Sequence, residues 1–368
     1  MRERIDTIKK KMHQEKLDAY LLQTRENKFY LSGLDHQTSD DHSISLMLIT
    51  KDKSYFLIGK MEAAPAAKVA TECEIVSVDK GDTAGSLIGT IAKDIGGIKR
   101  IGYEYFALKH MYVKSIREFI PDVEFIPSEI AENLRQIKTV DEMERISRAM
   151  EIADSAISEI KPLLTKGKTE NEIAWALELF VRSEFGVKEL AFPTIVASGV
   201  NSSSPHHVPT DKLIEKGDFV TIDFGVRNDG YCSDITRTFV IGQASDKQKN
   251  IYNTVLESLQ KATAASMPGI TGKELDEVAR SYIAERGYGE YFIHGLGHSL
   301  GVEVHEPPFI SASGDTSILP GVVFTIEPGI YIPEFCGVRI EDSVLMTDDG
   351  VKVLTKSPRE LIELEISD

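Results

Sequence analysis

The sequence is poor in cysteine. Only Cys73, Cys232 and Cys336 occur among 368 residues. Their odd number and wide spacing exclude a framework of paired disulfides and give no Cys-x-x-Cys metal site. This usage fits a reducing compartment, so we expect a cytoplasmic protein.

Long apolar runs and an excess of positive charge are also missing. No stretch approaches the ~20 apolar residues that a membrane-spanning helix needs, and charges recur from Met1 to Asp6. Asp and Glu (58) outnumber Lys and Arg (42), so the formal charge is −16. Because such a surface repels nucleic acid and anionic membranes, we expect neither as a partner.

The composition is that of a globular protein with more than one core. Hydrophobic residues make up 42% and charged residues 27% of 368 positions, near the averages of folded domains. From Ile5 to about Ile126, helical patterns alternate with short apolar runs such as residues 18–22 and 74–78. This alternation predicts an α/β domain.

A domain boundary is indicated near residue 130. Pro121 and Pro127 enclose the last apolar run, and a capping box then begins at Thr139. We therefore expect a first domain at residues 1–130 and a second at residues 131–368.

The second region contains an internal repeat. Gly167–Glu172 and Gly269–Glu274 share the pattern G-x-T-x-x-E, and each opens a helix through a capping box. At nearly equal distances downstream, Gly217–Gly225 and Gly321–Gly329 share G-x-x-x-T-I-[D/E]-x-G. The repeat predicts two halves related by a pseudo-twofold axis, with their sheets facing a shared cleft.

Four acidic residues lie in or beside apolar strand-like runs of this region. Asp223 precedes a turn at residues 228–230 and Asp234 follows it, so a hairpin would place the two acids together. Glu327 and Glu341 repeat the arrangement around a turn near Gly337. Burying such acids costs several kcal/mol unless a cation compensates them.

Five of the nine histidines fall in the same region: His206, His207, His294, His298 and His305. Carboxylates combined with imidazoles suit Mn²⁺, Co²⁺, Fe²⁺ or Zn²⁺ better than Ca²⁺ or Cu⁺. An acid that bridges two cations can hold them ~3.5–4 Å apart, which generates hydroxide at neutral pH.

These residues occur in blocks that resemble the pita-bread metallopeptidases, which include prolidase, aminopeptidase P and methionine aminopeptidase. The matching blocks are Phe192–Gly199, Pro205–His206, Thr221–Gly225, Ser233–Thr238, His294–Gly301, Val304–Pro307, Phe324–Gly329 and Val338–Asp342. The resemblance implies an α/β N-terminal domain followed by an α+β pita-bread (creatinase/aminopeptidase) catalytic domain with a pseudo-twofold internal repeat.

The resemblance also implies a metal site. By position, Asp223 chelates one metal, His298 and Glu327 bind the other, and Asp234 and Glu341 bridge both. The implied cofactors are two divalent ions, Mn²⁺ or alternatively Co²⁺, Zn²⁺ or Fe²⁺.

Further roles follow by the same route. Glu327 would also move the proton of the bridging water. His206 and His305 would contact the scissile carbonyl and the leaving group, and Arg339 would hold a bridging carboxylate in place. His294 is open between a structural and a functional role, and His207 is expected to be a surface-loop residue without a catalytic one.

The implied substrate is a small peptide with proline at the second position. An X-Pro bond is a tertiary amide without an N–H, so most peptidases cannot dock it. Val304–Pro307 is similar to the proline-specific members rather than to methionine aminopeptidase. Relatives of this length are often dipeptidases, so the resemblance implies an Xaa-Pro dipeptidase, and it also implies a homodimer. Aminopeptidase P activity on longer peptides, or hydrolysis of a different amide or C–N bond, stays open, because the acidic loop at residues 35–42 departs from the family.

Two other functions are disfavoured. Creatinase-like relatives that work without metal lose the acidic ligands, and binding proteins with this fold tend to lose them too. This chain retains all five ligand types.

Overall fold

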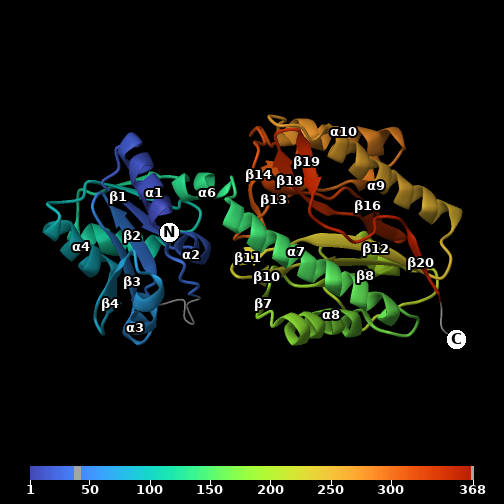
Figure 1. Ribbon diagram of the computed structural model, residues 1–368, viewed down its shortest axis with the longest axis horizontal. Helices are drawn as coiled ribbons and strands as arrows, with labels where there is room; N and C mark the ends of the chain where they lie inside the picture. Colours follow the sequence, from blue (N-terminus) through green and yellow to red (C-terminus); the bar gives the residue numbers. More distant parts are fainter. Residues whose placement is uncertain (37–42, 366–368) are drawn as a thin grey trace. The chain divides into compact units, whose positions relative to one another are not determined.

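A computed structural model describes residues 1–36 and 43–365. Most of the acidic loop expected at residues 35–42 lies outside the described residues. The chain forms two compact units, Met1–Leu134 and Arg135–Asp368, and the boundary expected at residue 130 falls on the first residue of α6 (Figure 1). Within the described ranges, no helix is both long and apolar enough to cross a membrane.

The first unit is built on a six-stranded sheet in the order β4-β3-β2-β1-β5-β6. Its strands are β1 (Ala19–Leu22), β2 (Leu46–Thr50), β3 (Ser54–Gly59), β4 (Glu74–Val78), β5 (Arg100–Tyr103) and β6 (Glu124–Pro127). Its helices are α1 (Arg2–Gln14), α2 (Arg25–Ser32), α3 (Lys60–Val69), α4 (Ala84–Asp94), α5 (His110–Phe119) and α6 (Ile130–Arg135). The mixture of parallel and antiparallel pairs confirms the predicted α/β class.

Four long helices organise the second unit: α7 (Val140–Ile160), α8 (Glu170–Phe185), α9 (Asp246–Ala265) and α10 (Gly272–Glu285). The three capping boxes predicted from the sequence are present at Thr139, Thr169 and Thr271. In each, the threonine hydroxyl accepts a bond from the backbone N–H three residues later, and a glutamate reaches back to the threonine N–H.

The strands of the second unit divide into two main sheets, ordered β20-β12-β9-β8 and β14-β13-β15-β18-β19. A three-stranded sheet (β11-β10-β7) and a hairpin (β16-β17) complete it. The strands are β7 (Glu189–Leu190), β8 (Ile195–Ser198), β9 (Phe219–Phe224), β10 (Val226–Asn228), β11 (Tyr231–Cys232), β12 (Ile235–Ile241), β13 (Gly297–Ser299), β14 (Glu306–Ile310), β15 (Val323–Ile326), β16 (Gly329–Ile332), β17 (Cys336–Arg339), β18 (Asp342–Thr347), β19 (Gly350–Val353) and β20 (Ile362–Leu364).

The predicted repeat is visible in the backbone hydrogen bonds. The start of α8 is hydrogen-bonded to the segment that precedes β9, and the start of α10 is hydrogen-bonded to the segment that precedes β15. The matching contacts are the bridges Thr169–Leu213 and Thr271–Ser317, and the bonds from Gly167 N–H to the Ile214 carbonyl (3.0 Å) and from Gly269 N–H to the Ile318 carbonyl (2.8 Å).

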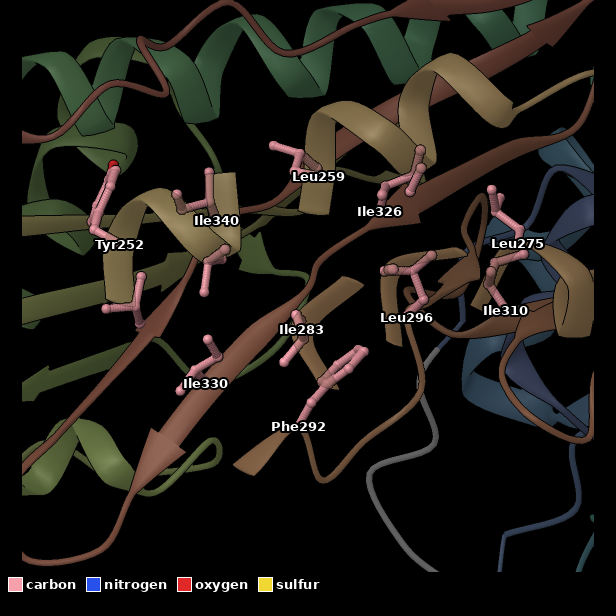
Figure 2. Packing of buried hydrophobic residues seen from close by; sticks show 14 of the residues in the cluster. Tyr252, Leu259, Leu275, Ile283, Phe292, Leu296, Ile310, Ile326, Ile330 and Ile340 are labelled. Atoms are coloured by element: carbon pink, nitrogen blue, oxygen red, sulfur yellow. The ribbon is translucent and has the colours of Figure 1, made fainter. Parts of the chain in front are cut away.

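Each half has its own core. Helices α7 and α8 pack on β8, β9 and β12, whereas α9 and α10 pack on β15 and β18. Figure 2 shows the second core, where Leu259 of α9, Leu275 and Ile283 of α10 and Ile326 of β15 are fully buried. Burying a side chain of this size contributes about 1.5–3 kcal/mol. The helices thus occupy one face of each sheet.

Candidate active site

In the first half, strand alternation directs an acid away from the core. Ile222 and Phe224 of β9 are fully buried in the core of α7 and α8, so Asp223 between them points to the opposite face. In the antiparallel pair of β9 and β12, Asp223 lies opposite Thr236. Asp234 immediately precedes β12, so the sheet brings both acids together.

The second half places its acids at strand ends. Glu327 follows β15 and Glu341 precedes β18, and these strands pair with Ile326 opposite Asp342. The connecting turn spans residues 333–335, close to Gly337 as expected, and Gly337 itself belongs to β17. Glycine is required there because a Cβ would lie 1.9 Å from the Ser202 carbonyl oxygen.

The five residues that the family resemblance implies as metal ligands converge. Carboxylate oxygens of Asp223, Asp234 and Glu341 lie within 4.8 Å of one another. His298 on β13 extends the cluster, with its Nε2 3.5 Å from Asp234 Oδ2 and 3.3 Å from Glu327 Oε1.

Burial and mutual repulsion perturb the protonation of the carboxylates. Desolvation, reinforced by neighbouring acids, raises the pKa of Asp234 and Glu341 well above the ordinary range. Desolvation also raises the pKa of Asp223, against the opposing effect of Arg339. A nearby cation would counter both causes and favour the ionised carboxylates.

Glu327 behaves differently because it faces an imidazole. Desolvation by itself would raise its pKa, but the hydrogen bond and charge of His298 lower it to about 2. The same contact outweighs desolvation at His298 and raises the pKa of the imidazole. Metal ligation requires neutral imidazole, so a cation binding here would release this proton.

The residues fit a group of divalent cations. Within the described part of the chain, the buried atoms Asp223 Oδ1 and Glu341 Oε1 have no hydrogen-bond partner. Unpaired buried oxygens are costly, and bound cations are the usual compensation. Four carboxylates and one imidazole are a donor set for divalent metals such as Mn²⁺, Fe²⁺, Co²⁺ or Zn²⁺.

The structure differs from the sequence expectation at Arg339. The guanidinium was expected to hold a bridging carboxylate, but its Nη2 lies 2.6 Å from Asp223 Oδ2. It reaches Glu341 only indirectly: Arg339 Nε donates to Thr236 Oγ1 (3.0 Å), which donates to Glu341 Oε2 (2.7 Å). The sequence could not assign this contact, because the partners are more than a hundred residues apart.

A cavity of about 670 Å³ opens beside the acids. His206, His294 and His305 line it, together with apolar side chains such as Phe192 and Phe309. The ring centroid of His305 lies 4.3 Å from that of His298. Desolvation, followed by the charge of His298, lowers the pKa of His305 to about 4, so this imidazole is neutral at pH 7.

His294 belongs to a network that the sequence left open. Its Nε2 lies 2.9 Å from the hydroxyl of Tyr331, which accepts a bond from Arg339 Nη1 (2.7 Å). Tyr331 therefore donates to His294, and the imidazole keeps its proton on Nδ1, 2.7 Å from the Gly295 carbonyl. Tyr331 and Thr236 were not singled out from the sequence. For Tyr331, the available signal was a tyrosine in an apolar strand, because a buried tyrosine hydroxyl needs a hydrogen-bond partner.

His207 lies in a loop, as expected, and its imidazole contacts a buried carboxylate. Its Nε2 lies 2.8 Å from Oε2 of Glu170, a fully buried carboxylate at the start of α8. Neither residue was expected to contribute to the site, since Glu170 lies some forty positions earlier in the sequence.

The two units and the acidic centre define a metal-dependent hydrolase. The model of metallopeptidase family M24 matches residues 144–348, and that of the creatinase/prolidase N-terminal domain matches residues 4–137. The chain belongs to metallopeptidase family M24, which implies bound divalent metal ions.

Known relatives extend over the full length. The Xaa-Pro dipeptidase of Pyrococcus horikoshii is 40% identical over 98% of this chain and 99% of its own. The structure of an Xaa-Pro dipeptidase from Bacillus anthracis matches with a TM-score of 0.91 and 40% identity, covering 98% and 99% of the two chains. That of an X-Pro aminopeptidase from Thermotoga maritima matches with a TM-score of 0.85 and 36% identity, covering 94% and 97%.

Proposed function

We propose that the protein is an Xaa-Pro dipeptidase that hydrolyses the bond preceding proline. Two divalent ions would be held by Asp223, Asp234, His298, Glu327 and Glu341. The observation that carries the proposal is the convergence of these donors beside a cavity lined by further histidines. Near-identical length and 40% identity to proteins named Xaa-Pro dipeptidase support the substrate class.

The cations, when bound, would lower the pKa of a shared water and polarise the scissile carbonyl. Glu327 is ionised at neutral pH, because its pKa is about 2. Its carboxylate faces the cavity and can accept a proton from the attacking water and pass it to the leaving nitrogen. Arg339 fixes the orientation of Asp223 through the 2.6 Å contact.

The histidines of the cavity wall would orient the substrate. His305 is neutral at pH 7, so one ring nitrogen donates and the other accepts. We assign His206 and His305 to the scissile carbonyl and the leaving group. The apolar side chains of Phe192 and Phe309 suit a proline ring, which offers no N–H to a polar wall.

Native metal, assembly and location belong to the same proposal. We expect Mn²⁺, with Co²⁺, Zn²⁺ or Fe²⁺ as alternatives, because carboxylates dominate the donor set. Free cysteines, two of them buried, support the cytoplasm. A homodimer is expected from the family resemblance alone.

A dialysis experiment tests the activity. Protein treated with EDTA should lose turnover of an X-Pro dipeptide and regain it with Mn²⁺. A panel of dipeptides and longer X-Pro peptides separates dipeptidase from aminopeptidase P activity, which the likeness to the Thermotoga maritima X-Pro aminopeptidase keeps in view. If metal-loaded protein leaves every X-Pro substrate intact, the proposal is wrong.

A matched pair of variants tests the ligand assignment. His298 and His305 are neighbouring imidazoles, but only His298 contacts the carboxylate cluster. His298→Ala should lower metal content and rate together, whereas His305→Ala should lower the rate and retain the metal. Full metal content in His298→Ala would remove this residue from the ligand set.

A further inference from the structure

Glu170 is a buried carboxylate outside the metal centre. It is the first residue of α8 and is 0% exposed. Its two oxygens accept hydrogen bonds from four residues of one loop. The contacts are Oε1 with Ser198 N (2.7 Å), Ser198 Oγ (2.8 Å) and Asn201 Nδ2 (3.1 Å), and Oε2 with Asn201 Nδ2 (3.3 Å), His207 Nε2 (2.8 Å), Thr210 N (3.1 Å) and Thr210 Oγ1 (2.7 Å).

The two oxygens bind opposite ends of the loop. Oε1 accepts hydrogen bonds from Ser198 at the beginning of the loop, and Oε2 accepts hydrogen bonds from Thr210 at its end. The chain between these points passes the cavity at Pro205–Pro209, the segment that includes His206. One carboxylate thus closes a loop whose middle forms a wall of the candidate active site.

The anionic form of Glu170 suits this arrangement. The backbone N–H, hydroxyl and amide groups that contact Glu170 are donors, and His207 Nε2 can donate as well. An amide in place of the carboxylate would turn an NH₂ group toward some of those donors. The N-terminus of α8 also favours a negative charge. Although desolvation opposes it, bonding to His207, Thr210 and Ser198 lowers the pKa of Glu170, so the carboxylate is ionised at neutral pH.

The loop is also connected to the metal centre. Arg339, which holds Asp223, directs its Nη1 to the Pro205 carbonyl oxygen at 3.3 Å. His206 therefore lies between an anchor on the metal side, at Pro205, and an anchor on the helix side, at His207.

We propose that Glu170 is a positioning residue that sets the place of His206 in the cavity by clamping residues 198–210, with His207 as one arm of the clamp. The inference rests on the proposed function insofar as His206 contacts substrate. The clamp itself is a property of the loop and can be tested without turnover.

The experiment compares Glu170→Gln with Glu172→Gln in the full-length, metal-loaded protein. Glu172 is the matched control because it lies in the same helical turn but caps the helix through Thr169 instead of binding the loop. Hydrogen–deuterium exchange should become on the order of tenfold faster at residues 199–210 in Glu170→Gln only. Unchanged exchange in that loop would overturn the proposal.

A double-mutant cycle with His206→Ala tests the functional part. Glu170→Gln should lower kcat/KM for an X-Pro dipeptide on the order of tenfold at unchanged metal content. In the His206→Ala background it should cost little more, because its effect passes through that side chain. Fully additive losses would show that Glu170 acts independently of His206 and would overturn the positioning role.

Failure of the proposed function can be distinguished from failure of the clamp, and so can a folding defect. If the wild-type protein cleaves no X-Pro substrate, the proposed function fails while the exchange experiment still reports on the clamp. If Glu170→Gln does not fold, Thr210→Val removes one arm of the clamp at nearly constant shape. It should then give the same loop-specific change in smaller measure, and an unaltered loop would count against the clamp.

Discussion

The two halves of the second unit share a backbone arrangement but differ in the side chains that use it. At the start of α8, Glu170 follows the capping threonine, whereas Gly272 stands at the matching position of α10. The first half holds its cavity loop through a carboxylate. In the second half, the backbone of β14 packs directly on the helix, and a Cβ on Gly272 would lie 2.1 Å from the Phe309 carbonyl oxygen.

The matched acids of the repeat differ in the same way. Asp223 faces Arg339, a guanidinium that is permanently charged. Glu327 faces His298, an imidazole that can lose its proton. The two halves therefore share a backbone scaffold, while local side chains decide the chemistry of each half.

The largest effect should come from replacing the two matched acids. Glu327→Gln keeps the shape but removes both a proposed metal ligand and the proton acceptor, so kcat should fall about 10²–10⁴-fold even at saturating metal. Asp223→Asn should act chiefly by lowering metal content. Elemental analysis and steady-state kinetics on both variants check this, and a kcat for Glu327→Gln close to that of the wild type would contradict it.

The packing of the second half can be tested at its glycine. Gly272→Ala places a Cβ against the backbone of Phe309 and should lower the free energy of unfolding by about 1–3 kcal/mol. Lys273→Ala, at the exposed neighbouring position, is the control and should change it little. Urea unfolding of both variants measures the difference, and equal stability would mean that the close approach is not required.

Each half also supports an acid of the other half, but not equally. Thr236 donates to the carboxylate of Glu341, whereas Ser343 donates to the backbone carbonyl of Asp234 (2.9 Å). Thr236→Val should therefore weaken metal binding about tenfold, and Ser343→Ala should weaken it less. Metal titration of both variants decides the order, and the reverse order would break the comparison.

The smallest effect concerns pH. The folded-state pKa of Glu170 lies below its ordinary value of 4.5, so its stabilising contribution is complete above that value and is lost as pH falls through the folded pKa. The difference in unfolding free energy between wild type and Glu170→Gln should shrink by under about 1 kcal/mol between about pH 6 and about pH 4. Urea unfolding across this range is the measurement, and a constant difference would argue that the carboxylate does not titrate as described.

The sequence was informative wherever a signal is local. Capping boxes at Thr139, Thr169 and Thr271 need residues only three positions apart, and all three are present. The turn expected near Gly337 is present as well, at residues 333–335.

Long-range partners were beyond such signals. The sequence indicated that Arg339 supports a carboxylate but assigned it to the bridging acids. The contact between His207 and Glu170 was not predicted, because nothing near His207 in the sequence indicates it. Both contacts escaped prediction for one reason: the partner of a charged side chain is fixed only by the packing of sheets and helices.

The sequence by itself determined the repeated scaffold, the acids in apolar strands and the histidines in the same region. These features can be read from the order of residues, because they depend on periodicity and on the cost of burying a charge. Only the tertiary structure decided which oxygen faces which nitrogen, and that Glu170 closes the loop that carries His206. Strand register and helix packing bring such groups to within about 3 Å, and this proximity alone turns a list of residues into a site.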